Sequence, residues 1–236
     1  AAGRPKLGVF GLADLVGLDT IDHVLGNVRT NCPDDDEADA HVTPAWYKML
    51  LTEGVLGNKT GKGFYQRTKQ RDDKGRRITL ARNWKTGEYA PKARPRFDSV
   101  KQALAFKDDS AAAVRALIRG DDKAAQLVWA VTADSLIYTA KRVPEIADDI
   151  VNIDRGMRWG FNWDLGPFES WDAIGVRESV DRMKAEGRTI PAWVEAMLAA
   201  GRESFYMLDG GVRTYWDGVA GEAKPMPDSE SWLWVA

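Results

Sequence analysis

The stretch LGPFESWDAIG, residues Leu165 to Gly175, has a counterpart near the start of the chain in LGVFGLADLVG, residues Leu7 to Gly17. The two stretches align without gaps at an offset of 158 (165 − 7). They share a leucine, two glycines, a phenylalanine and an aspartate, which is Asp14 in the first copy and Asp172 in the second. The chain therefore contains one structural unit used twice.

Further segments repeat in the same order. TPAWYKMLLTEG at Thr43 to Gly54 matches IPAWVEAMLAAG at Ile190 to Gly201 at an offset of 147. A weaker match pairs DKGRRIT with DGGVRTY and TGEYAP with AGEAKP. Repetition over this length favours two domains, a first helical repeat at 1–97 and a second at 98–236.

The front of the first repeat is expected to be missing. In the second copy a long helical pattern precedes the opening motif, whereas only six residues precede Leu7. We therefore expect the sequence to be part of a longer protein.

The composition is that of a globular domain. Of 236 residues, 44% are hydrophobic and 29% are charged, with a formal net charge of −2, so nothing indicates the basic face of a nucleic-acid-binding protein. The single cysteine, Cys32, excludes an internal disulfide and a multi-cysteine metal site. No apolar run reaches the roughly 20 residues that cross a bilayer. These features predict a cytoplasmic protein without a membrane span.

Apolar periodicity predicts a mainly α fold. The expected helices cover 10–25, 44–53, 98–105, 110–119, 121–142, 144–157, 177–186 and 191–200. Thr43 is expected to cap the second of these with Pro44 at its first position, and the helix at 121–142 is expected to be mostly buried. Turn signals predict β-hairpins at 67–87 and around Gly210-Gly211.

The glycine-rich segment LGNKTGKGFY, Leu56 to Tyr65, admits two interpretations. Its three glycines favour a tight structural turn that packs the two aromatic residues at its end into the helices. Alternatively, Lys59 and Lys62 contact a cofactor or CoA. The order of residues is not that of a Walker motif.

Other polar residues are given a structural interpretation. The acidic loop at 34–39 is interpreted as solvated rather than cation-binding, and the basic stretch 67–77 as an exposed hairpin rather than a CoA phosphate contact. Asp14 and Asp172 are expected to cap or bridge between helices rather than act as acid–base groups. Cys32 is not interpreted as a nucleophile, because the sequence shows no base that would activate its thiol. We therefore assign no catalytic residue and no metal ligand.

The motifs GPFE-(x)-D-(x)-G and KTGKGFY together resemble the C-terminal domain of 3-hydroxyacyl-CoA dehydrogenase. The first copy keeps the second motif intact at Lys59 to Tyr65 but has Val9 in place of the proline. The second copy keeps Gly166 to Glu169 but has Ser204 to Tyr206 where the glycine-rich motif would be. The tandem arrangement is similar to that of the multifunctional fatty-acid β-oxidation proteins.

The resemblance implies tandem helical domains like the C-terminal domain of 6-phosphogluconate dehydrogenase, with short β-hairpins. It also implies a parent enzyme that uses NAD and an acyl-CoA substrate, and an upstream NAD-binding domain that carries the catalytic His-Glu pair. No G-x-G-x-x-G fingerprint is present here, and Ala125 stands where the family uses an asparagine. The 236 residues would then form a scaffold, a cleft wall and an interdomain or homodimer interface of the parent enzyme. We expect them to be inactive alone and to bind no cofactor.

Two alternatives remain at this point. One is a helical protein-interaction module without catalytic function. The other is the helical domain of a β-hydroxyacid or 6-phosphogluconate dehydrogenase, although those families lack the KTGKGFY signature.

Overall fold

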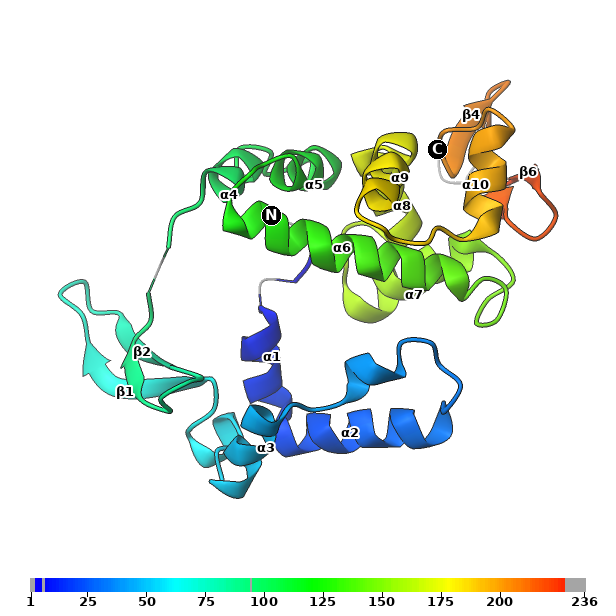
Figure 1. The fold of residues 1–236 in the computed structure, drawn as a ribbon. Coiled ribbons are helices and arrows are strands. Elements are labelled where there is room, and N and C mark those ends of the chain that lie inside the picture. Colours follow the sequence, from blue (N-terminus) through cyan, green and yellow to red (C-terminus); the bar gives the residue numbers. More distant parts are fainter. Residues whose placement is uncertain (1–2, 6, 94, 228–236) are drawn as a thin grey trace. The chain divides into compact units, whose positions relative to one another are not determined.

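The computed structural model describes residues 3–5, 7–93 and 95–227, and it is mainly α as predicted (Figure 1). Two compact units are present: an N-terminal unit, Lys6–Pro95, and a C-terminal unit, Arg96–Ala236 together with Ala1–Pro5. Each unit combines helices with one three-stranded antiparallel sheet. No helix in the described ranges is long and apolar enough to span a membrane.

The N-terminal unit has three α-helices, two short 3-10 helices and three strands among its described residues. In order these are α1 (Val9–Val16), α2 (Leu18–Asn31), η1 (Ala38–His41), α3 (Ala45–Thr52), η2 (Asn58–Thr60), β1 (Tyr65–Arg71), β2 (Arg77–Arg82) and β3 (Tyr89–Pro91). The helix predicted at 10–25 is interrupted at Gly17, whose φ of 106° is open to glycine but not to most residues. Its small core gathers around Leu18, Tyr47 and Leu50.

The C-terminal unit has a larger core. Its elements are α4 (Asp98–Ala103), α5 (Ser110–Ile118), α6 (Lys123–Lys141), α7 (Ile150–Phe161), α8 (Pro167–Ile174), α9 (Val176–Ala185), α10 (Ala192–Ala199), β4 (Tyr206–Asp209), β5 (Val212–Asp217) and β6 (Glu222–Pro225). Phe168, Trp171 and Phe205 are fully buried at its centre. Helix α8 packs against α5, α6 and α7.

The sequence repeat is a structural repeat. Helices α1, α2 and α3 and strands β1 to β3 correspond in order to α8, α9 and α10 and strands β4 to β6. Helices α4 to α7, which precede this set in the C-terminal unit, have no counterpart in the described part of the N-terminal unit. The two units therefore share a module, and the second unit adds helices that cover it.

The predicted hairpins are confirmed, and each gains a third strand that was not predicted. Strand β3 pairs with β2 through Leu80 and Pro91, and β6 pairs with β5 through Thr214 and Pro225. Gly210 and Gly211 both have positive φ, as a two-residue type I′ hairpin turn requires.

Two predicted helix starts are wrong. Pro44 is the N-cap residue of α3, and the hydroxyl of Thr43 donates to Asp22 at 2.5 Å instead of capping the helix. Helix α7 begins at Ile150 rather than at 144, because the carboxylate of Asp149 accepts the N–H of Asn152 at 2.7 Å and closes the first turn there.

Helix α6 is less buried than predicted. It begins after Asp122, whose carboxylate accepts two N–H groups of the first turn, and one face packs into the core through Trp129 and Leu136. Leu127 and Val131 lie on another face and are 65% and 57% exposed. Because α6 has apolar residues on more than one face, its sequence does not show which face is buried. The Trp-rich tail, 231–236, lies outside the described residues.

Candidate functional site

The repeated aspartates make the same contact in both units. In the N-terminal unit the carboxylate of Asp14 accepts the N–H groups of Phe64 and Tyr65, each at 2.7 Å. In the C-terminal unit the carboxylate of Asp172 accepts those of Phe205 at 2.7 Å and Tyr206 at 2.9 Å. Each aspartate thus ties the first helix of the module to the start of its sheet.

This contact satisfies backbone groups that would otherwise be buried without partners. Phe205 is fully buried, with its ring 5.0 Å from that of Phe168 and 5.2 Å from that of Trp171. Burying the ring carries the neighbouring peptide groups away from water, where an unpaired N–H costs about 1–3 kcal/mol. Asp172 removes that penalty for two N–H groups.

The same geometry argues against acid–base chemistry at these carboxylates. Burial raises the pKa of Asp172 to about 7, although the two N–H groups and the Arg202 guanidinium act in the opposite direction. Burial also raises the pKa of Asp14. Both oxygens of each carboxylate are already held by backbone N–H groups, which cannot relay a proton to a substrate.

A third carboxylate, Asp154 on α7, was not singled out from the sequence. It is buried, and it accepts the N–H of Phe168 at 2.8 Å and that of Glu169 at 3.0 Å. The hydroxyl of Tyr206 donates to it at 2.8 Å. Asp154 therefore caps the N-terminus of α8 from a neighbouring helix. Burial raises its pKa to about 7.

Gly166 makes room for this cap. A Cβ at Gly166 would lie 2.4 Å from the side chain of Asp154, closer than a real Cβ contact allows. The N–H of Gly166 donates to the carboxylate of Glu169 at 2.9 Å, so the first turn of α8 is satisfied by carboxylates. The G-P-F-E motif, Gly166 to Glu169, thus forms a helix N-terminus that packs directly against the buried carboxylate of Asp154.

The glycine-rich loop of the N-terminal unit uses its own N–H groups. Gly57 donates to the carbonyl of Lys62 at 2.8 Å, Thr60 to that of Gly57 at 3.1 Å, and Gly61 to that of Asn58 at 3.1 Å. The side chain of Lys59 forms an ion pair with Asp19 on α2. These contacts favour a structural turn; the contact of Lys59 and Lys62 with a cofactor stays a prediction.

The glycines of this loop are needed for close approach to α1. A Cβ at Gly57 would lie 2.5 Å from the carbonyl oxygen of Asp14, and one at Gly63 would lie 2.0 Å from its Oδ1 atom. In the C-terminal unit, Ser204 occupies the position that matches Gly63. The connection from the end of the PAW helix to the first strand is longer in the first copy. Phe64 lies 10 residues after Gly54, whereas Phe205 lies 4 residues after Gly201, and the additional residues form the loop that contacts Asp14.

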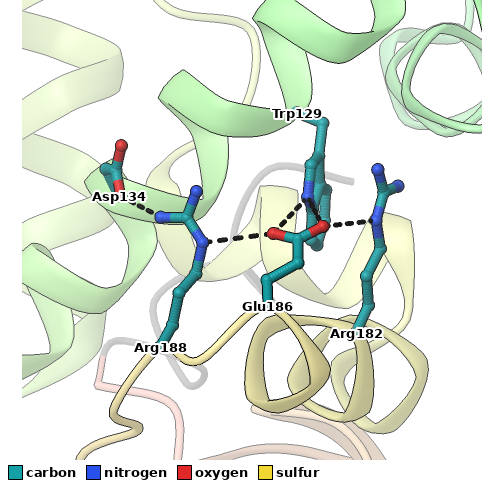
Figure 2. Close-up of polar contacts among 5 residues, drawn as sticks. All are labelled: Trp129, Asp134, Arg182, Glu186 and Arg188. Atoms are coloured by element: carbon teal, nitrogen blue, oxygen red, sulfur yellow. Dashed lines mark hydrogen bonds and ion pairs between the residues drawn. The ribbon is translucent and has the colours of Figure 1, made fainter.

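Five polar residues connect α6 to the end of α9 (Figure 2). The indole N–H of Trp129 donates to Glu186 at 2.7 Å, and the guanidinium of Arg182 stacks 3.9 Å from the indole ring and donates to the same carboxylate. Arg188 bridges Glu186 to Asp134. Burial opposes ionisation of Glu186, but these hydrogen bonds outweigh it and lower its pKa.

A cavity of about 470 Å³ lies in the C-terminal unit beside α6 and α7. Its walls are mostly apolar, and no carboxylate, imidazole or thiol belongs to the described residues that line it. The guanidinium of Arg4 lies 3.0 Å from the ring centre of Trp163 at its edge, and burial lowers the pKa of Arg4 to about 10. The cavity suits an apolar group and offers no acid–base pair.

The remaining predicted positions are not brought together. Cys32 is exposed at the end of α2, and Ala125 is buried in the first turn of α6. Across residues 3–5, 7–93 and 95–227 no group of three histidine, cysteine or acidic residues is placed to hold a metal ion.

Part of the N-terminal unit is similar to a known domain family. Residues 1–67 match the family model described as "3-hydroxyacyl-CoA dehydrogenase, C-terminal domain". These residues are therefore similar to that domain family. The 3-hydroxyacyl-CoA dehydrogenase resemblance that was drawn from the GPFE and KTGKGFY motifs is thereby confirmed.

Curated relatives extend the match along the chain. The chain is 40% identical over 215 residues to a probable 3-hydroxyacyl-CoA dehydrogenase of Bacillus subtilis (strain 168). This alignment covers 91% of the chain and 26% of the relative. The chain is 27% identical over 169 residues to a putative fatty acid oxidation complex trifunctional enzyme of Rickettsia felis, covering 71% of this chain and 21% of that relative. The chain thus spans about a quarter of their length.

Among solved structures, 3-hydroxybutyryl-CoA dehydrogenase from Escherichia coli K12 is similar, with a TM-score of 0.49 and 16% identity. The similarity covers 82% of this chain and 52% of that chain.

Proposed function

We propose that these residues are the C-terminal helical part of a longer NAD-dependent (3S)-3-hydroxyacyl-CoA dehydrogenase of fatty-acid β-oxidation. The observation that carries the proposal is the 40% identity over 215 residues to the Bacillus subtilis protein of that name. Within the longer enzyme this part acts as a scaffold, as one wall of the acyl-CoA cleft and as an interdomain or homodimer interface in the cytoplasm.

NAD would be held elsewhere in that enzyme. The sequence contains no G-x-G-x-x-G fingerprint, and in the glycine-rich loop, 56–65, the N–H groups of Gly57, Thr60 and Gly61 donate to carbonyl groups of the same loop. These three N–H groups are therefore not free to bind a diphosphate, as the N–H groups of a phosphate-binding loop are. An upstream NAD-binding domain would provide that site.

The chemistry of the parent enzyme would also lie upstream. NAD accepts a hydride from C3 of the substrate while a base takes the proton of the hydroxyl group. The buried carboxylates described here hold helices and strands together. Their contribution is a rigid wall that keeps the cleft in shape.

An activity measurement tests the proposal. We expect no turnover of acetoacetyl-CoA with NADH by the 236-residue chain and clear turnover by the protein encoded by the complete reading frame. Activity of the 236-residue chain would overturn the scaffold role. A complete reading frame without a G-x-G-x-x-G segment within about a domain's length upstream would overturn the dehydrogenase assignment.

A further inference from the structure

The sheet of the N-terminal unit is strongly basic, although the whole chain is slightly acidic. Residues 65–92, which include β1 to β3, contain 9 lysines and arginines and 3 acidic residues, a net charge of +6 (9 − 3). Since the whole chain has a net charge of −2, all other residues together carry −8 (−2 − 6). Positive charge gathered in one small sheet favours interaction with an anionic partner.

The pairing of the strands places four of these cations on one face of the sheet. Arg67 lies opposite Thr79, and Arg71 lies opposite Arg77. Lys92 follows β3 and donates its N–H to the carbonyl of Thr79 at 3.0 Å from the other side. Side chains that lie directly opposite across strands share a face, as do those two positions apart in a strand. The cationic face defined in this way consists of the exposed residues Arg67, Arg71, Arg77 and Lys92.

The fold does not neutralise the cationic face. Asp72, the carboxylate at the start of the hairpin turn, forms its ion pair with Arg76. In the described part of the chain no carboxylate forms an ion pair with any member of the cationic face. Arg71 and Arg77 lie directly opposite each other, and like charges in that arrangement destabilise a sheet. A bound anion would remove this repulsion.

The matching sheet of the C-terminal unit shows that the module folds without these charges. Residues 206–226 contain 2 basic and 3 acidic residues, a net charge of −1 (2 − 3). Leu208 stands at the position of Arg67, next but one after the first tyrosine of the sheet. Met226 stands at the position of Lys92, since each donates its N–H to the middle strand directly after the last proline. Folding of the sheet therefore does not account for the cations.

The shape of the cationic face favours an extended anionic surface over a small ligand. None of its residues lines the cavities of about 470 Å³ and about 120 Å³, whereas a small anion is held by groups that converge in a concave site. Single-stranded nucleic acid is bound on free aromatic rings. The ring of Tyr65, which lies on this face, is covered by the ammonium group of Lys92 at 4.2 Å from its centre. The phosphate groups of a lipid surface, in contrast, are spread over a plane, as these cations are.

We propose that the cationic face of the N-terminal sheet docks on a membrane surface that contains anionic phospholipids. Its guanidinium and ammonium groups bind the phosphates of the lipid headgroups, and the protein stays at the surface of the bilayer. Each basic residue held near such a surface strengthens binding about fivefold. The site goes beyond the proposed function and does not depend on it, because it rests on the charges of the sheet alone.

Sedimentation of the 236-residue chain with vesicles tests the proposal. Vesicles of phosphatidylcholine and phosphatidylglycerol in equal amounts are compared with vesicles of phosphatidylcholine alone. Salt is set at about 0.1 M or about 1 M, where the Debye length is roughly 10 Å or 3 Å. We expect binding to the mixed vesicles that weakens at least about tenfold at the higher salt, and no binding to phosphatidylcholine alone. Equal binding to both kinds of vesicle, or binding to neither, would overturn the proposal.

Two variants with the same net charge locate the binding surface. The first replaces all four residues of the cationic face by glutamine and should weaken binding to the mixed vesicles more than about a hundredfold. The second removes four exposed cations of the C-terminal unit and should weaken it less than about threefold. Equal weakening by both variants would contradict the proposal, because net charge alone would then hold the protein. The substitutions of the second variant are Arg96→Gln, Lys101→Gln, Lys107→Gln and Lys123→Gln.

Thermal unfolding without vesicles shows whether the first variant is intact. Arg71→Gln combined with Arg77→Gln should leave the unfolding temperature unchanged or raise it slightly, because a pair of like charges is removed. A clear fall would mean that other groups of the fold neutralise these arginines, which would contradict an open cationic face.

Competition with duplex DNA distinguishes a membrane from a nucleic acid as the partner. DNA is added at the same concentration of phosphate groups as the anionic lipid, at about 0.1 M salt. We expect most of the protein to remain on the mixed vesicles. Transfer of the protein to the DNA would overturn the membrane assignment. None of these measurements depends on dehydrogenase activity, so the proposal can fail while the proposed function stands.

Discussion

Helices α1 and α8 are the same motif in two environments. Both begin at a glycine, carry a phenylalanine at the second helical position and send an aspartate to the first strand of a sheet. Helix α8 packs against α5, α6 and α7, and its Phe168 is fully buried, whereas Phe10 of α1 is half exposed. The aspartate contact therefore belongs to the module itself, while the burial of its helix depends on the helices that precede it.

The largest expected effect concerns the aspartates. Asp172→Ala leaves the N–H groups of Phe205 and Tyr206 buried without partners and should destabilise the C-terminal unit by about 4 kcal/mol. Asp14→Ala, the matched change, should cost the N-terminal unit about 1–2 kcal/mol, because water can reach the half-buried Phe64 more readily. Denaturant unfolding, followed by hydrogen exchange of amides in each unit separately, measures both losses of stability. Equal losses in the two units would contradict the difference in burial between the two aspartate contacts.

A smaller effect is expected at the glycines that begin the two helices. Gly166→Ala places a methyl group against Asp154 and should destabilise the C-terminal unit by roughly 2–3 kcal/mol. Gly8→Ala in the 236-residue chain should change the stability of the N-terminal unit by less than about 0.5 kcal/mol, because the added Cβ meets open space. Thermal unfolding of the two variants tests this, and a large loss for Gly8→Ala would show that α1 is already covered.

The pH dependence of Asp172 distinguishes burial from solvent exposure. Its pKa is about 7 in the folded protein and lower in the unfolded chain, so the folded state binds more protons between roughly pH 4 and pH 7. The stability that Asp172 contributes is therefore fully present at low pH and falls as the pH rises through this window. The loss caused by Asp172→Asn should shrink from pH 4 to pH 7; a loss that grows would contradict the assignment.

The smallest effect concerns the network in Figure 2. Trp129→Phe keeps the packing of α6 but removes the N–H that donates to Glu186. It should cost about 1 kcal/mol, the usual value for one hydrogen bond with an acceptor that keeps other donors. Urea unfolding measures the change. Arg182→Lys is the control variant, because it removes the guanidinium that stacks on the indole ring and keeps a positive charge. A loss of stability above about 3 kcal/mol for Trp129→Phe would contradict the prediction and indicate lost core packing.

The repeat made much of the module predictable from sequence. Turn signals predicted the two hairpins, and the matching positions of Asp14 and Asp172 predicted a structural role, although each aspartate ties a helix to the start of a sheet instead of bridging two helices. The cap by Asp154 was not predicted, because its partners lie 14 and 15 residues away in the next helix and the first copy contains no matching residue. The available signal was the position of Asp154, four residues after Ile150 and three after Val151, which places an acidic residue on the apolar face of the helix.

Other differences have local causes. Pro144 predicts an earlier start for α7 than the structure shows, because the carboxylate of Asp149 caps the first turn five residues later. The exposure of Leu127 and Val131 was missed because α6 is apolar on more than one face, and periodicity alone does not say which face a neighbour covers. These positions required tertiary contacts that a single sequence does not reveal.

The most direct test compares four amides in the 236-residue chain by hydrogen exchange. Those of Phe168 and Glu169 donate to Asp154 and should exchange only with opening of the C-terminal unit. Those of Phe10 and Gly11 should exchange at least about a hundredfold faster, since no described residue of their unit accepts these two N–H groups. Equal protection of the two pairs would contradict the account that α1 is an uncovered copy of α8.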